Sequence, residues 1–485
     1  MQPKTKKQID MRIKMKVLSV ALMTVMMGMT QVAAAQEVDA RTGATSRNGV
    51  AQSENDAQSR NEVAQSDSAL RSLTKWQRRL SRLHVGGYGE VAYTRNFYSD
   101  RLDRYKLPEE ARKSPSHGRF DIPHFVVYLG YDFGKGWKFN TEIEFEHGGT
   151  GQAYEKESEE GGEWEFETEK GGEVELEQLW IEKSFSEGLN VRAGHIVVPV
   201  GLNNAHHEPL SFFTVYRPEG EHTILPSTWH QTGISLWGKT LKGRLRYETQ
   251  LLAGMNADNF TTATWVNRGC VSPLEFDIAN KYGFAGRLDY YLKDGMRVGL
   301  SGYYGHTQGN SYPAQDTENI YKGQLAIGSI DFSMDYWGVI VRAQADYGYL
   351  GDTQNLSDNI VTGDMNTYNR GNKKSPYHHT SPIGSNAYAV GIEAGYDIFH
   401  TMGKLHRDGQ RLIVFGRYDR YNPCADSSTR GKYGYLDRNA VALGVNYMPV
   451  KGVVVKCDYS QRLLKSPYNN EPSLNLGVAF QGWFL

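Results

Sequence analysis

Few residues of this chain are arranged for covalent chemistry, and the one short run that could hold a metal ion lacks the usual ligand spacing. His206, His207 and Glu208 all carry ligand atoms, but they are adjacent, and no second pair of ligands follows at a fixed distance. The chain contains no G-x-S-x-G, H-E-x-x-H, P-loop or dinucleotide-binding motif. We therefore expect no metal, no cofactor and no catalytic residues, although a serine and a histidine brought together from distant strands would leave no such motif.

Charged residues at every second position are more informative. In residues 137–146, mainly aromatic and aliphatic side chains occupy one face of an extended chain, whereas Glu142, Glu144 and Glu146 occupy the other. Residues 244–253 and 297–304 alternate in a similar way. The core of a soluble protein does not accommodate such a charged face. The wall of a water-filled membrane barrel does, because one side of each strand contacts lipid and the other contacts water.

The alternation predicts which charges face the interior of such a barrel. The expected basic residues are Arg192, Arg244, Arg246, Arg287, Arg297, Arg342, Arg417, Lys456 and Arg462. The expected acidic residues are Glu90, Glu142, Glu144, Glu146, Glu248, Asp289, Asp331, Asp335, Asp346, Asp419 and Asp458. Solvation by channel water explains most of them individually, because charges tune selectivity only where a pore is narrow. The candidate pore-lining residues on this wall are Arg192, Arg244, Arg246, Glu248, Arg287, Arg297, Arg342, Glu142 and Glu144.

One long connection, residues 199–231, is expected to narrow the channel. It is rich in aromatic residues and contains three prolines, at positions 209, 218 and 226. Apolar side chains at this density would not stay in water, so we expect the loop to fold onto the inner wall. Its polar residues then become the candidates for a constriction, namely Arg217, Glu219, Glu221 and His222.

The elements that must position these residues are sixteen extended segments. They begin near Leu83, Phe120, Gly136, Val174, Leu189, Thr232, Gly243, Tyr282, Met296, Gly323, Gly338, Ser385, Gln410, Arg438, Gly452 and Pro472. In the fourth segment the apolar phase slips between Leu176 and Leu179, which predicts a β-bulge. The last segment alternates from Ser473 to Phe484 and can pair with the first, which would close the sheet in lipid.

The connections alternate strictly between short and long. Turn residues form the short ones, such as Gly134–Gly136 and Lys293–Gly295, and only 400–409 is longer. The long loops lie near 97–117, 147–173, 199–231, 256–281, 306–322, 351–384, 422–437 and 463–471. This arrangement predicts an all-β transmembrane antiparallel β-barrel of about sixteen strands, with short periplasmic turns and long external loops. A soluble β-sandwich has no reason to sort its loops in this way.

The N-terminal part is expected to lie outside the barrel. Residues 1–35 combine six basic residues, an apolar run and a small-residue site ending at Ala35, which predicts an export signal. Residues 36–82 are polar at first and then carry leucines and Trp76 at helical spacing, which predicts a periplasmic segment ending in a short helix. The barrel is expected to occupy residues 83–485, with both mature termini in the periplasm.

Charge and cysteine content argue against a nucleic-acid partner and against a metal site built from cysteines. The formal charge is −1, and removing residues 1–35, which carry six basic residues and one acidic residue, makes it about −6. A nucleic-acid partner is therefore not expected. The three cysteines, Cys270, Cys424 and Cys457, have no metal-type spacing. A bond between Cys270 and Cys424 stays open. The acidic second loop, with eight glutamates between positions 155 and 169, is interpreted as a solvated hairpin.

The chain resembles the phosphate-selective porin O and P family as found in Bacteroides-type bacteria. The similarity lies in FVVYLGYDFGKGWKFNTEIEFEH, LEQLWIEKSFSEGLNVRAGHIVVPVGLNN and PSTWHQTGISLWG, and it covers most of the chain from Leu83 onward. The resemblance implies a sixteen-stranded, usually trimeric channel with an inward-folded third loop. It also implies a ladder of basic residues where phosphate is the solute, whereas here the inward acids are at least as numerous. We therefore do not expect phosphate selectivity.

The expected function is that of an outer-membrane porin in a Gram-negative bacterium. Small hydrophilic or ionic solutes would diffuse through the barrel, and its partners would be outer-membrane lipid and two further copies of the chain. Two alternatives stay open on the sequence alone. The long loops could serve as an adhesin or surface antigen on a barrel scaffold, or the barrel could be an outer-membrane hydrolase.

Overall fold

The computed structural model describes residues 75–101, 104–149, 155–156, 166–167, 172–257, 260–270, 277–307, 309–310, 323–354, 356, 383–426 and 433–485. The chain divides into two compact units, Met1–Trp76 and Gln77–Leu485, and the sheet lies in the second. The predicted export signal lies outside the described residues, as does most of the predicted N-terminal segment. Helix α3 (Lys75–Leu80) is the described part of the predicted helix. No helix in the described part of the chain is long and apolar enough to cross a bilayer.

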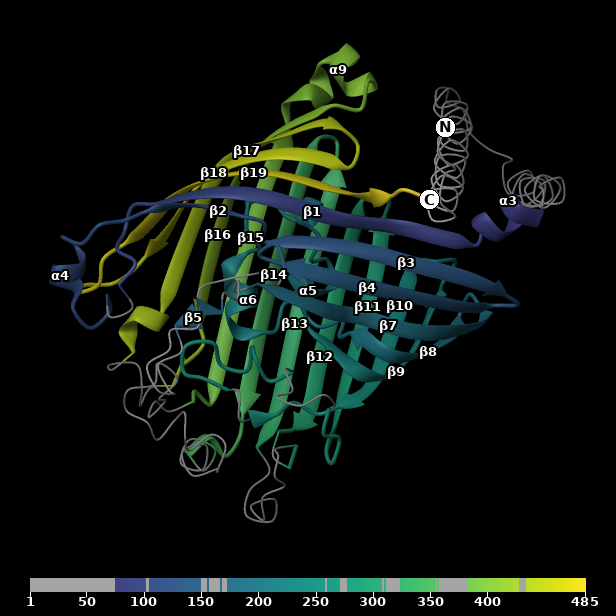
Figure 1. Ribbon diagram of the computed structural model, residues 1–485, viewed down its shortest axis with the longest axis horizontal. Helices are drawn as coiled ribbons and strands as arrows, with labels where there is room; N and C mark the ends of the chain where they lie inside the picture. Colours follow the sequence, from purple (N-terminus) through teal and green to yellow (C-terminus); the bar gives the residue numbers. More distant parts are fainter. Residues whose placement is uncertain are drawn as a thin grey trace, which may run out of the picture. The chain divides into compact units, whose positions relative to one another are not determined.

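Seventeen strands form one antiparallel sheet (Figure 1). They are β1 (Leu83–Asn96), β2 (Gly118–Asp121), β3 (His124–Gly134), β4 (Trp137–Glu146), β7 (Glu173–Ser186), β8 (Leu189–Val197), β9 (His230–Thr240), β10 (Leu245–Ala253), β11 (Tyr282–Lys293), β12 (Met296–His306), β13 (Gln324–Tyr336), β14 (Val339–Leu350), β15 (Asn386–Asp397), β16 (Arg411–Asn422), β17 (Arg438–Val450), β18 (Val453–Leu463) and β19 (Glu471–Trp483).

Strands β2 and β3 act as one interrupted strand. Both pair with β1, β2 through Thr94↔Arg119 and β3 through Val85↔Leu129. Pro123 lies between them and has no backbone N–H to continue the ladder. The barrel therefore has sixteen strand positions, as the alternation predicted.

The sheet closes on itself through its first and last strands. Strand β1 pairs with β19 from Gly86↔Trp483 to Asn96↔Ser473, and with β2 and β3 on its other edge. Figure 1 shows β1 lying between β19 and β3. Closure satisfies the backbone groups that an open edge would leave unpaired, which is the condition for a β-structure to exist in lipid. The predicted pairing of the last segment with the first is confirmed.

The two faces of the strands differ sharply in chemistry. Large apolar side chains point outward and are exposed on the isolated chain, for example Leu300, Ile330 and Leu443. Their sequence neighbours Ser301 and Asp331 point inward and are buried. The alternation found in the sequence is therefore an inside-to-outside alternation of a barrel.

The predicted bulge lies in β7 at Glu177. Strand β7 pairs with β4 through Gln178↔Glu142 and then Leu176↔Ile143, so Glu177 has no partner in the ladder. The extra residue restores the apolar phase on both sides of it and lets its own side chain turn inward, where it is fully buried.

Short turns join the strands at one end of the barrel and long loops join them at the other. Lys135 and Gly136 between β3 and β4 have φ values of 55° and 77°, the left-handed conformations that a tight turn requires. The longest turn, between β15 and β16, contains η4 (Ile398–Thr401) and α9 (Gly403–Arg407). The long loops contain α4 (Pro108–Ala111), η5 (Gly434–Leu436) and the two-residue strands β5 (Glu155–Lys156) and β6 (Phe166–Glu167).

The described parts of the acidic loop and the cysteines agree with the simpler expectations. Strands β5 and β6 pair antiparallel, as a hairpin would, and most of that loop lies outside the described residues. Cys270, Cys424 and Cys457 all keep the thiol form, so Cys270 and Cys424 do not form a disulfide.

Candidate functional site

The connection between β8 and β9, residues 198–229, is called here the inward loop. It contains α5 (Leu202–Ala205), η1 (Pro209–Ser211) and α6 (Glu219–Ile224). Its aromatic residues Phe212, Phe213 and Trp229 are at most 3% exposed. A surface loop could not bury them, so this segment packs against the inner wall of the barrel.

Glu221 holds the inward loop in its folded shape. Its carboxylate accepts hydrogen bonds from the backbone N–H groups of Leu202, Asn203 and Asn204, at 2.9 to 3.1 Å. Asn204 then closes the neck of the loop, because its side-chain amide donates to the Val198 carbonyl and its Oδ1 accepts from the backbone N–H of Trp229. Since Glu221 is fully buried, it is a structural residue rather than a group presented to passing solutes.

The inward loop reaches the wall formed by β14 to β18. The ammonium group of Lys456 donates to the backbone carbonyls of Pro209, Phe212 and Thr214, at 2.5, 3.0 and 2.9 Å. The backbone N–H of Val215 donates to Asp458 at 2.7 Å. A cation that satisfies three carbonyl oxygens makes Lys456 the principal anchor on this side.

The same loop also contacts β1. The hydroxyl of Thr94 donates to the Tyr216 hydroxyl at 2.9 Å. The guanidinium of Arg217 donates to the Tyr88 hydroxyl at 3.4 Å and to the Ser227 carbonyl at 3.1 Å. The loop therefore leaves the wall at β8, contacts both β1 and β18, and returns to the wall at β9.

Burial perturbs two acid–base groups of the inward loop. It raises the pKa of Glu221 to about 7, although the N–H groups of Asn203 and Asn204 oppose the shift. Burial disfavours the charged form of His207, but the nearby carboxylates of Glu142 and Glu177 outweigh it and raise its pKa to about 10. An imidazolium therefore faces the acidic part of the wall in this structure.

A cavity of about 510 Å³ lies on the long-loop side of the inward loop. The predicted constriction residues Arg217, Glu219 and His222 all line it, together with wall residues of β1 and β16–β19. Glu219 makes an ion pair of 2.5 Å with Arg462, and Arg438 lies 3.8 Å from it. Three of the four predicted constriction residues therefore meet at one cavity, and the fourth, Glu221, does not line it.

A smaller cavity of about 130 Å³ lies near the short-turn end. Phe212 and Phe213 of the inward loop line it, opposite Arg342, Arg411 and Asp335. Phe213 stacks on Phe415 with 5.0 Å between ring centroids. The inward loop therefore contributes to both cavities, with its polar residues on the first and its aromatic residues on the second.

Basic residues of the inner wall are paired with acids on neighbouring strands. Arg287 and Arg297 both contact Asp289 and Asp331, at distances from 2.5 to 2.9 Å. The space for this cluster comes from Gly299, where an added Cβ would collide with Arg287 and Asp331. These guanidinium groups are already neutralised and are not free to form an anion ladder.

A second row of paired charges crosses β14, β15 and β16. Glu393 accepts from Arg342 at 2.5 Å and from Arg417 at 3.0 Å, and Arg417 also contacts Asp419 at 2.6 Å. Glu393 is 1% exposed. The pairing is strong because antiparallel register places these side chains in one row.

The remaining predicted wall residues occupy different environments. Arg192 pairs with Glu182 at 3.0 Å, and Arg246 lies 3.4 Å from Glu248. Arg244, expected on the inner wall, instead precedes β10 in an exposed turn. The predicted segment started at Gly243, whereas the left-handed Lys242 and Gly243 extend the turn and delay the strand.

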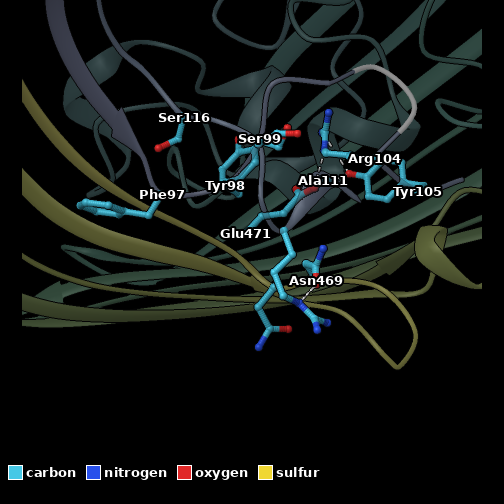
Figure 2. A pocket seen from close by; sticks show the side chains of 12 residues that line it. Phe97, Tyr98, Ser99, Arg104, Tyr105, Ala111, Ser116, Asn469 and Glu471 are labelled. Atoms are coloured by element: carbon cyan, nitrogen blue, oxygen red, sulfur yellow. Dashed lines mark hydrogen bonds and ion pairs between the residues drawn. The ribbon is translucent and has the colours of Figure 1, made fainter. Parts of the chain in front are cut away.

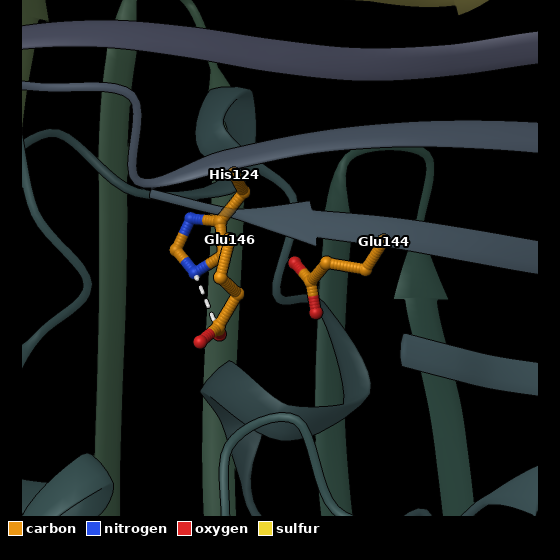
Figure 3. A group of neighbouring side chains, drawn as sticks. All are labelled: His124, Glu144 and Glu146. Carbon is orange, nitrogen blue, oxygen red and sulfur yellow. Dashed lines mark ion pairs between the residues drawn. The ribbon is translucent and has the colours of Figure 1, made fainter. Parts of the chain in front are cut away.

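Glu142 and Glu144 belong to a buried acidic cluster on β4 and β7. Glu142, Glu144 and Glu177 are at most 3% exposed. Glu142, Glu177 and His207 place one ligand atom each within 4.8 Å of one another, and His124, Glu144 and Glu146 do the same. Figure 3 shows the Glu144 carboxylate pointing toward His124 and Glu146.

Sequence reasoning did not single out Glu177, and it did not identify what Lys456 holds. The apolar phase slip signalled the bulge, but a phase slip does not say that the extra side chain turns inward. Lys456 was expected on the inner wall, yet its three partners lie about 240 residues earlier in the chain. A sequence signal linking Glu177 with the histidines at 206 and 207 would have indicated that these residues lie close together in the fold.

The long-loop end also carries a pocket of about 160 Å³ between the first and last outer loops. Figure 2 shows Arg104, Tyr105 and Glu471 converging there. Arg104 and the Tyr105 hydroxyl both donate to Glu471 at 2.7 Å, and Arg462 contacts the same carboxylate at 2.5 Å. These contacts tie the first outer loop to the start of β19 beside the barrel mouth.

Comparisons with known proteins found a relative in sequence and several similar solved structures. No family model matches the chain. An uncharacterized protein of Aquifex aeolicus (strain VF5) is 28% identical over 395 residues, which cover 80% of this chain and 77% of the relative. One similar solved structure is Salmonella typhi OmpF in complex with daunomycin, with 12% identity and a TM-score of 0.48 over 82% of this chain and 97% of that chain. Another is the outer membrane channel DcaP of Acinetobacter baumannii, with 9% identity and a TM-score of 0.46 over 82% of this chain and 97% of that chain.

Proposed function

We propose that this protein is an outer-membrane porin through which small hydrophilic or ionic solutes diffuse passively. The observation that carries the proposal is the closed barrel of sixteen strand positions, with apolar side chains outside and charged side chains inside. A barrel of this size encloses a lumen wide enough for water, whereas eight strands would be filled by side chains. Solute movement then needs no energy source and no catalytic residue.

The inward loop is proposed as the constriction. The loop begins after β8 and is held at β18 by Lys456 and Asp458, and these distant attachments support a fixed position across the lumen. The polar residues that would meet a solute are those on the larger cavity, chiefly Arg217, Glu219 and His222. Opposite charges at a narrow point favour dipolar solutes over apolar ones.

Weak ion selectivity follows from the paired wall. The guanidinium groups of Arg287, Arg297, Arg342 and Arg417 are neutralised by adjacent carboxylates. A phosphate-selective channel would instead need unpaired cations along the path. We therefore propose mixed-charge permeation and not phosphate specificity.

The proposed setting is the outer membrane, with the short-turn end and the termini in the periplasm. The outward Leu300, Ile330 and Leu443 are 53% to 67% exposed on the isolated chain, and lipid would cover them. The family resemblance implies a homotrimer. Crosslinking of the protein in native membranes tests that assembly.

Deleting residues 203–228 tests the constriction. Conductance in planar bilayers should rise because the deletion removes the proposed constriction. The deleted segment includes the residues that contact Lys456 and Tyr88. A matched control removes residues 402–408 from the longest turn, whose described side chains are mostly exposed. Unchanged conductance after removal of 203–228, with a folded barrel, would place the constriction elsewhere.

A further inference from the structure

The buried acidic cluster between the inward loop and the wall lacks the partners that such charges need. Glu177 is fully buried, and neither of its carboxylate oxygens has a hydrogen-bond partner. Oε1 of Glu142 and Oε1 of Glu144 are also without one. A buried carboxylate with no donor is costly, because nothing replaces the water it has lost.

Two other buried carboxylates in the lumen are satisfied by donors. Glu393 is held by Arg342 and Arg417, and Glu221 accepts from several N–H groups. Near Glu177 the available guanidinium is Arg217, but its terminal nitrogens donate to Ser227 and Tyr88, and its Nε has no partner. Arg217 therefore donates no hydrogen bond to Glu177, and a further cation could balance the charge of the cluster.

His207 is oriented as a metal-binding histidine would be. Its Nδ1 lies 3.1 Å from the Asn204 carbonyl oxygen, which can only accept, so Nδ1 carries a proton. Its Nε2 has no hydrogen-bond partner and lies 3.8 Å from Oε1 of Glu142. Metal-bound histidines usually donate their second ring nitrogen to a carbonyl or carboxylate in this way, which fixes the ring and leaves the other nitrogen for the ion.

We propose that Glu142, Glu177 and His207 bind one divalent transition-metal ion of the zinc or manganese type. The three ligand atoms lie within 4.8 Å of one another, whereas ligands around such an ion stand roughly 3.5 Å apart, so small side-chain rotations complete the site. Two carboxylates neutralise a divalent charge, which suits a buried position. The imidazole selects against calcium and magnesium, because those ions prefer oxygen ligands.

The ion would join three separate elements. Glu142 lies on β4, Glu177 on the bulge of β7, and His207 on the inward loop. The site would therefore fasten the loop to β4 and β7, in addition to its attachment to β18 through Lys456, and the ion would replace the proton on Nε2. The second group, His124, Glu144 and Glu146, adjoins it but is more open. His124 is already held by Glu90 at 2.6 Å through Nδ1.

Calorimetry on the folded full-length barrel in detergent, stripped with chelator, tests the proposal. Titration with ZnCl₂ should show one tight site per chain, and CaCl₂ should bind much more weakly. Glu177→Gln and His207→Ala should each weaken zinc binding by more than about 100-fold, since both remove a direct ligand. The matched control is Asp346→Asn, which removes a carboxylate that is equally without a partner and 2% exposed but belongs to neither group.

Three results would overturn the site. These are no zinc uptake by the wild-type barrel, calcium binding as tight as zinc binding, and a loss in Asp346→Asn equal to the loss in Glu177→Gln. Folding of every variant is checked by the heat-dependent shift of its band on a gel. His207→Ala keeps the test valid if Glu177→Gln fails to fold, because His207 lies in a loop and not in a barrel strand. Calorimetry measures metal binding and does not measure conductance. The metal-site proposal can therefore fail or succeed independently of the porin proposal.

Discussion

Replacing Lys456 with methionine should release the inward loop from the wall of β14 to β18. The Lys456 side chain is 2% exposed, donates to three loop carbonyls and lies 4.1 Å from the centroid of the Phe212 ring. Methionine has a similar length and preserves the packing on Phe212. It removes the charge and leaves the carbonyls of Pro209, Phe212 and Thr214 without that donor.

The size of the effect follows from those contacts. A hydrogen bond to a charged group contributes about 1.5–3 kcal/mol, and the three bonds at one nitrogen are not additive. Val215 and Asn446 still tie the loop to the wall through Asp458 and the Phe213 carbonyl. We therefore expect a net loss of about 3 kcal/mol, which increases the released fraction of the loop by roughly 100-fold.

Chymotrypsin measures that fraction, because cleavage after Phe212 or Phe213 requires the loop to leave the wall. If opening is fast relative to cleavage, the cleavage rate follows the released population. Lys456→Met should be cleaved about 100 times faster than wild type, and single channels should become noisier. Lys451→Met, an exposed lysine in the turn before β18, is the control. Equal cleavage rates for wild type and Lys456→Met would refute the anchoring role.

Two further substitutions test the wall and the outer face. Glu393→Gln should lower the unfolding free energy by about 3 kcal/mol in urea titrations, because Arg342 and Arg417 lose their shared carboxylate. The control Glu187→Gln changes an exposed glutamate and should have little effect. Equal losses in the two variants would contradict the ion-pair account. Leu443→Arg should cost about 2–4 kcal/mol in lipid vesicles if this outward side chain faces the bilayer, whereas Leu241→Arg in an exposed turn should cost less than about 1 kcal/mol. A tolerated arginine at 443 would mean that this face does not contact lipid.

Most of the fold was predictable because each strand carries its own local signal. The period of two marks the strands, and turn residues such as Lys135 and Gly136 mark where they reverse. The slip in apolar phase near Leu176 predicts the bulge, which the strand register places at Glu177. Closure through β1 and β19 followed from an even strand number and the cost of an open edge in lipid.

The site was less predictable because its contacts join residues far apart in the chain. Alternation showed that Arg287 and Asp331 face inward, but not that cross-strand register and Gly299 bring them into contact. Glu221 was expected to face solutes, whereas it holds the inward loop together from inside. The sequence does not indicate His207 as a metal ligand, because the carboxylates that lie near it in space, Glu142 and Glu177, are distant from it in the chain.

Single-channel recording of the purified, folded wild-type barrel in planar bilayers tests the central claim most directly. The proposed porin predicts stable, stepwise ionic conductance, with a small reversal potential in a salt gradient because the wall charges are paired. A folded barrel that inserts but shows no conductance would contradict the claim that this protein is a channel.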